Sequence, residues 1–109
     1  MPAGSSARDE DTSTKEWPGL IARLRQETFD KPGHRPVRQQ LAIAYNNYGV
    51  ALSEEGQWAQ AETQFQEALR FDERNTQFAE NLSQVYINQA HEAYQRYDLA
   101  AAMQRLDRA

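Results

Sequence analysis

The sequence contains no cysteine among its 109 residues, which excludes disulfide bonds, thiol catalysis and metal sites built on cysteine. Long apolar runs are missing too: no stretch approaches the roughly 18–20 residues of a membrane span, and the N-terminus lacks the apolar core of a secretory signal. Cations are in the minority, because 12 Lys and Arg stand against 16 Asp and Glu, a formal net charge of −4. This charge argues against a nucleic-acid backbone as the main partner.

Residue patterns that would support catalysis or metal binding are also missing. The two histidines, His34 and His91, lie far apart in the sequence, and neither has a second histidine at the spacing that a zinc-binding helix requires. There is no glycine-rich phosphate loop, and no serine stands in the context of a nucleophile elbow. We therefore predict a protein without catalytic residues, metal or cofactor, and not an enzyme.

The first fourteen residues differ in composition from the rest. Residues 1–14 are small, polar and charged, with nothing to bury in a core, so we predict a disordered leader there. Residues 15–109 provide enough chain for one domain with a modest core.

Apolar residues in this domain recur at spacings of three and four, and no segment alternates with a period of two, so the sequence predicts an all-α fold. Proline and glycine mark two of the turns, at Pro32-Gly33 and at Gly56. We expect five helices: from near Thr14 to Phe29, from Pro36 to Glu55, from Trp58 to Phe71, from about Phe78 to Tyr97, and a last one capped by Asp98 that carries Leu99, Met103 and Leu106 on one face.

The central part of the chain carries a helical-hairpin pattern. Its residues are Tyr45, Tyr48-Gly49, Leu52, Gly56, Trp58, Ala61, Phe65 and Ala68, followed by a turn at 72–75. Over about 42–75 this pattern resembles a tetratricopeptide repeat, although Glu73 stands where the family has a turn proline. The flanking units are degenerate, and the one after 75 has about four extra residues, which predicts a lengthened fourth helix. Small Gly49 and Ala61 fall where paired helices would approach closely.

The resemblance implies a stack of antiparallel helical hairpins, a fragment of a right-handed α-α superhelix whose first helices line a concave groove. Such a scaffold binds a protein or peptide segment, with Asn47 and Asn81 as the amides that hold the peptide backbone. Because Glu54 and Glu80 are its charged members, the groove favours a neutral or basic segment. The groove residues are expected to be Ile43, Asn46, Asn47, Val50, Ser53, Glu54, Gln77, Glu80, Asn81, Gln84, Ile87 and Asn88.

Other functions stay open at this level. An array without a polar capping helix exposes an apolar face, so the chain could instead self-associate through its last helix, at Leu99, Met103 and Leu106. A regulatory domain of a larger protein is a further alternative. The style of the repeat favours a bacterial source, and the sequence leaves the compartment open between the cytoplasm and the bacterial envelope.

Overall fold

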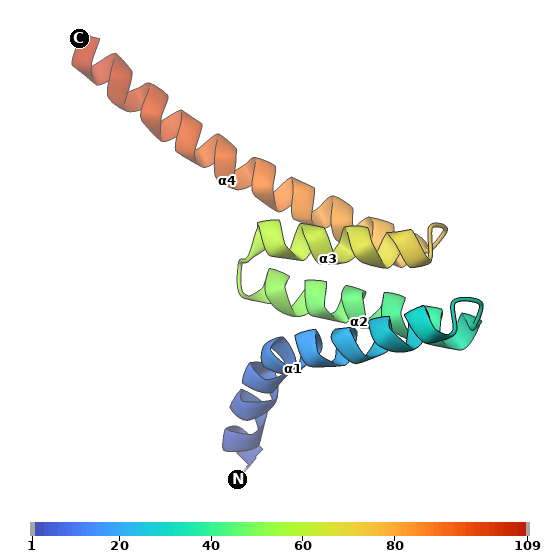
Figure 1. The fold of residues 1–109 in the computed structure, drawn as a ribbon. Helices are drawn as coiled ribbons and strands as arrows, with labels where there is room; N and C mark the ends of the chain where they lie inside the picture. Colours follow the sequence, from blue (N-terminus) through green and yellow to red (C-terminus); the bar gives the residue numbers. More distant parts are fainter. Residues whose placement is uncertain (1, 109) are drawn as a thin grey trace.

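Residues 2–108 of the protein form four α-helices, which are connected by short turns and packed against each other (Figure 1). This computed structural model describes the backbone of residues 2–108 and the side chains of residues 16–100 and of Met103. Within that part no strand occurs, so the predicted all-α class is confirmed. The helices are α1 (Pro2–Asp30), α2 (Arg35–Glu54), α3 (Trp58–Phe71) and α4 (Thr76–Arg108).

The prediction of five helices is wrong at the C-terminal end, because α4 continues unbroken from Thr76 to Arg108. Asp98 lies inside α4 and does not start a new helix. Neither glycine nor proline interrupts the chain here, and an aspartate in a helix interior costs less than about 1 kcal/mol. The boundary expected between a fourth and a fifth helix at residues 97–98 is therefore absent. The fourth helix is longer than the repeat pattern implies, as predicted, and it continues to Arg108.

The first helix also starts earlier than predicted, at Pro2 and not near Thr14. Pro18, expected in the first turn, lies well inside α1, where a proline removes a backbone hydrogen bond and favours a kink. Figure 1 shows α1 bent partway along its length. The side chains of residues 1–15 lie outside the described residues, and the disordered leader over 1–14 stays a prediction.

Local side-chain chemistry explains the three turns. His34 caps α2, since its Nδ1 accepts a hydrogen bond from the Val37 N–H, and Pro36 stands in the first turn. Gly56 lies in the α2–α3 connection and has a φ of +76°, which glycine adopts without strain. Asn75 accepts from the Phe78 N–H at 3.0 Å and so replaces the missing turn proline at the start of α4. The predicted turns around Gly56 and at 72–75 are confirmed.

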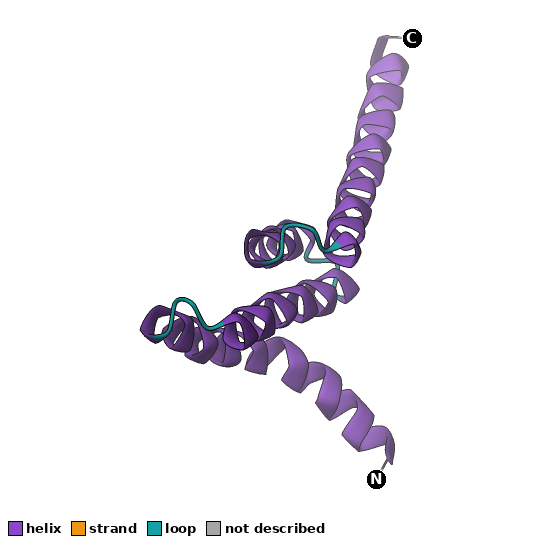
Figure 2. Cartoon of the chain, turned by 90° about the vertical axis from the view of Figure 1, so that its right-hand side faces the viewer, coloured by secondary structure: helices purple, strands orange, loops and turns teal. Residues whose placement is uncertain are grey.

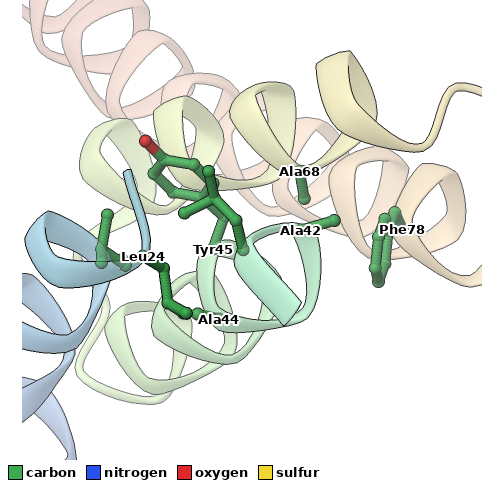
Figure 3. Close-up of a cluster of buried hydrophobic side chains, with 8 residues drawn as sticks. Leu24, Ala42, Ala44, Tyr45, Ala68 and Phe78 are labelled. Carbon is green, nitrogen blue, oxygen red and sulfur yellow. The ribbon is translucent and has the colours of Figure 1, made fainter. Parts of the chain in front are cut away.

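The larger part of the core lies where α2 meets the other three helices. Figure 3 shows Leu24 of α1 beside Ala44, and Ala42 near Phe78 of α4 and Ala68 of α3. The buried members of this cluster are Ile21, Leu24, Leu41, Ala42, Ala44, Tyr45, Ala68 and Phe78. Because α1, α2, α3 and α4 all contribute, this cluster fixes the relative positions of the four helices.

A second, smaller cluster joins α2, α3 and α4 around Phe65, and consists of Leu52, Ala61, Phe65 and Val85. Gly49 of α2 lies directly against the Phe65 ring, since a Cβ atom at Gly49 would be 2.7 Å from Phe65 Cε1. Ala61 is completely buried. The prediction that Gly49 and Ala61 mark close helix approaches is confirmed.

The buried Tyr45 leads to a prediction on pH dependence. Burial raises the pKa of its phenol above the ordinary value of 10.0, an effect that Glu67 reinforces and that Arg25 and Arg70 oppose. The ring stacks on Phe71 with centroids 6.1 Å apart. Because the folded-state pKa is raised, the corresponding stability is fully present below pH 10 and is lost as the pH rises through the folded-state pKa.

We therefore expect the free energy of unfolding of Tyr45→Phe to fall less than that of wild type as the pH rises above 10. At pH 7 the two values should lie within about 1 kcal/mol of each other. Urea denaturation of both proteins between about pH 7 and pH 11 measures this difference. If the free energy of unfolding depended on pH in the same way in both proteins over the whole range, a raised Tyr45 pKa would be contradicted.

Candidate functional site

Helices α2 and α4 lie next to each other, although α3 separates them in the sequence. The Asn81 side chain of α4 donates a hydrogen bond from Nδ2 to Asn46 Oδ1 of α2 at 2.8 Å. Asn81 also accepts through Oδ1 from Gln77 Nε2 at 3.1 Å. These amide contacts fix the spacing of the two helices and leave the surface between them open further along both helices.

An open hollow of about 300 Å³ lies next to this amide bridge. Its floor is apolar and comes from three helices, with Val50 of α2, Trp58 and Phe65 of α3, and Val85 of α4. Its rim is polar, and consists of Ser53, Glu54, Asn81, Gln84 and Asn88. A small apolar floor with polar groups around it is the usual composition of a ligand site.

The rim can still form hydrogen bonds to a ligand. Ser53 Oγ has no hydrogen-bond partner among the described protein atoms, but it is buried, so a ligand does not reach it in the free protein. Gln84 Nε2 donates to Asn88 Oδ1 at 3.2 Å, which leaves the Asn88 amide N–H groups and the Gln84 carbonyl oxygen available to a ligand. The Gln84 oxygen can thus accept a hydrogen bond from a backbone N–H of a ligand, and the Asn88 amide can donate one to a backbone C=O.

Glu54 is the one charged residue of the lining. It is exposed at the end of α2, so its charge is largely screened by solvent. The absence of a cation from the lining means that a carboxylate or phosphate group would have no charged partner there. The charge of the hollow therefore suits a neutral or basic ligand.

The structure brings half of the predicted groove residues into this lining: Val50, Glu54, Asn81, Gln84 and Asn88, together with Ser53. Asn46 instead holds Asn81. Ile43, Asn47, Gln77, Glu80 and Ile87 are exposed but do not line the hollow. Asn47, predicted as a peptide-holding amide, is thus outside the lining, and Asn81 already forms two hydrogen bonds within the protein. The role of these residues in binding stays a prediction.

Three floor residues were not predicted as groove residues: Trp58, Phe65 and Val85. Their helical spacing indicates burial, and Phe65 and Val85 are indeed buried. Nothing in the spacing shows that a hollow ends on top of them, because that depends on the distance between α2 and α4. The one signal in the sequence is the pairing of Gly49 with a large aromatic residue on the next helix.

Neither histidine forms part of a metal site within the described residues, where no group of three metal-ligating side chains occurs. His34 caps α2, and His91 Nε2 lies 3.2 Å from Gln95 Nε2 on the outside of α4. None of the described helices is both long and apolar enough to cross a membrane. No protein-family model matches the chain, and comparisons with curated proteins and with solved structures give no significant match.

Proposed function

We propose that this chain is a tetratricopeptide-like scaffold that binds a peptide segment of another protein in the hollow between α2 and α4, and that it has no enzymatic activity of its own. The observation that carries the proposal is the hollow itself, with an apolar floor from three helices and a rim of amides and one hydroxyl. In this arrangement α2 is the first helix of the α2–α3 hairpin in a right-handed α-α superhelix, and α4 takes the place of the first helix of the next unit.

The close contact of Gly49 with Phe65 supports this proposal. The family pattern places a small residue where the second helix of a hairpin packs against the first, and Gly49 lies against the Phe65 ring of α3 in this way. Phe65 is also part of the floor. The same residue pair that joins the hairpin therefore shapes the bottom of the proposed binding site.

The lining indicates which peptide chemistry fits. One aliphatic or aromatic side chain would cover the floor at Val50 and Val85, and burial of such a side chain contributes about 1.5–3 kcal/mol. Amide groups of Gln84 and Asn88 would bind the peptide backbone. A lysine or arginine next to the apolar residue would lie near Glu54, and the peptide class is therefore one apolar residue flanked by a base.

Peptide display with the immobilised protein tests the proposal, followed by titration of the selected peptides. We expect Val50→Glu to weaken their binding by at least about tenfold, or about 1.4 kcal/mol, because the new carboxylate would be buried unpaired against the apolar floor and near Glu54. Val50 is 39% exposed in the free protein, so the fold should tolerate the change.

Ala59→Glu is the matched control, since it adds the same charge at an exposed position of α3 outside the lining. It should bind the selected peptides like wild type. If no peptide sequence is enriched, or if Val50→Glu and Ala59→Glu bind equally well, the hollow is not a peptide site.

A further inference from the structure

Helix α4 is much longer than the helix it packs on, with 33 residues against 14 in α3. Among the described side chains, the last hydrogen bond between the two helices joins Gln89 Nε2 to Glu62 Oε1 at 3.2 Å. Beyond this point α4 runs clear of all other helices, as both Figure 1 and Figure 2 show. We call residues 86–103, which include the last turns in contact with α3, the α4 arm.

The arm carries an apolar surface on one side. Six residues on this side recur at spacings of three and four, and they include two pairs that are adjacent in the sequence. This is the pattern of a helix face that packs in a core. All six side chains are exposed, and the exposed fraction reaches 67% for Tyr94 and 74% for Tyr97. This surface, the arm stripe, consists of Tyr86, Ile87, Ala90, Ala93, Tyr94 and Tyr97.

The arm stripe is not the surface that the sequence predicts for self-association. Leu99 and Met103 are exposed as expected, at 64% and 58%, but helical geometry of about 100° per residue places them about 160° and 120° round the helix from Tyr97. Leu106 lies outside the described side chains. The three tyrosines of the arm stripe form the larger apolar surface here.

The size of the arm stripe fits a second copy of the same chain. A tyrosine buries about 150–250 Å² when it is fully covered, and three tyrosines and an isoleucine are between 44% and 74% exposed. Two copies would together bury on the order of 1,000 Å² from these side chains alone, and the alanines and flanking residues add to this area. That total approaches the roughly 1,200 Å² at which specific interfaces begin.

The ion pair of the arm does not contribute to this surface. Arg96 Nη2 donates a hydrogen bond to Glu92 Oε1 at 3.1 Å, and a rotation of about 100° per residue places Glu92 on the side of the helix away from Tyr94 and Tyr97. The stripe itself carries no charge, so two copies can pair antiparallel around Tyr94 without burying an ion.

The small residues of the stripe complete the match. Ala90 and Ala93 leave room on the helix surface, and in the antiparallel pair Tyr97 of one copy falls over these two alanines of the other. Large side chains opposite small ones allow two helices to pack closely. We propose that the α4 arm is a homodimerisation surface, on which a second copy of this chain binds antiparallel through the same arm stripe.

Sedimentation equilibrium of the whole chain between about 1 µM and about 1 mM tests this proposal. We expect a concentration-dependent dimer for wild type and a dissociation constant at least about tenfold larger for Tyr97→Glu, which places a charge inside the interface, against Ala90 and Ala93 of the other copy. Gln95→Glu is the control, because it adds the same charge at an exposed position on the other side of the arm, and it should dimerise like wild type. Circular dichroism of each variant verifies that the helices are retained.

A wild-type chain that stays monomeric at about 1 mM would overturn the proposal. So would a wild-type dimer that Tyr97→Glu leaves intact, since the interface would then lie elsewhere. Peptide binding in the hollow does not depend on either outcome.

Discussion

Replacing Phe65 with alanine should lower the free energy of unfolding by about 3–5 kcal/mol, the largest effect expected of any single substitution in this chain. Phe65 is 1% exposed and is the largest fully buried side chain among the described residues. It packs with Leu52 of α2, Ala61 of α3 and Val85 of α4, so its loss leaves a cavity where three helices meet. Domains of this size have a total stability of about 5–15 kcal/mol, and a substantial part of the molecules could unfold.

Phe29→Ala is the matched control, because Phe29 is the same residue type but is 81% exposed on α1. Its removal should change the free energy of unfolding by less than about 0.5 kcal/mol. Urea denaturation followed by circular dichroism measures both variants. Equal effects of the two substitutions would mean that the Phe65 ring does not fill the space between α2, α3 and α4.

Gly49→Ala should destabilise the protein by up to about 2 kcal/mol, the second large effect. A methyl group at Gly49 would lie 2.7 Å from Phe65 Cε1 and 2.9 Å from two further ring atoms, and the buried ring has little room to move. Overpacking of this kind costs about 1–3 kcal/mol. The cost has to exceed the gain of about 1 kcal/mol that alanine brings to a helix interior.

Gly19→Ala provides a control of opposite sign. Gly19 lies in α1, and a methyl group added there would meet no neighbouring side chain or helix within 4 Å. Only the helix-propensity gain then remains, and the protein should become more stable by about 0.5–1 kcal/mol. The double variant Gly49→Ala/Phe65→Leu should lose less free energy of unfolding than the two single variants lose in sum, because the shorter leucine leaves room for the new methyl group. Additive effects in this double-mutant cycle would show that the two residues do not touch.

The sequence predicts the middle of this fold well and its two ends poorly. Gly56 and Asn75 mark true helix boundaries, because a positive φ at Gly56 and a side-chain cap at Asn75 are local features that single residues determine. Asp98 could equally cap a new helix or lie within a long one. The choice depends on whether a further helix is present to cover α4, which the spacing of apolar residues does not reveal.

The candidate site shows the same division between local and long-range information. Helical periodicity places Val50, Glu54, Asn81, Gln84 and Asn88 on one side of their helices, and these residues do line the hollow. Its position along α2 and α4 depends on the Asn46–Asn81 hydrogen bond at 2.8 Å, which joins residues far apart in the sequence. For this reason Ile43 and Asn47 lie outside the hollow although they share the face of α2.

The most direct measurement of whether the hollow between α2 and α4 is a binding site is a ¹H–¹⁵N NMR titration of the labelled protein with a display-selected peptide. We expect the largest chemical-shift changes at Val50, Ser53, Gln84 and Asn88, and at the Trp58 indole N–H. Saturation of these signals at one stoichiometric equivalent would support a single site. Changes that are confined to α1 or to the α4 arm, with the Val50 and Asn88 signals unmoved, would contradict a peptide-binding hollow between α2 and α4.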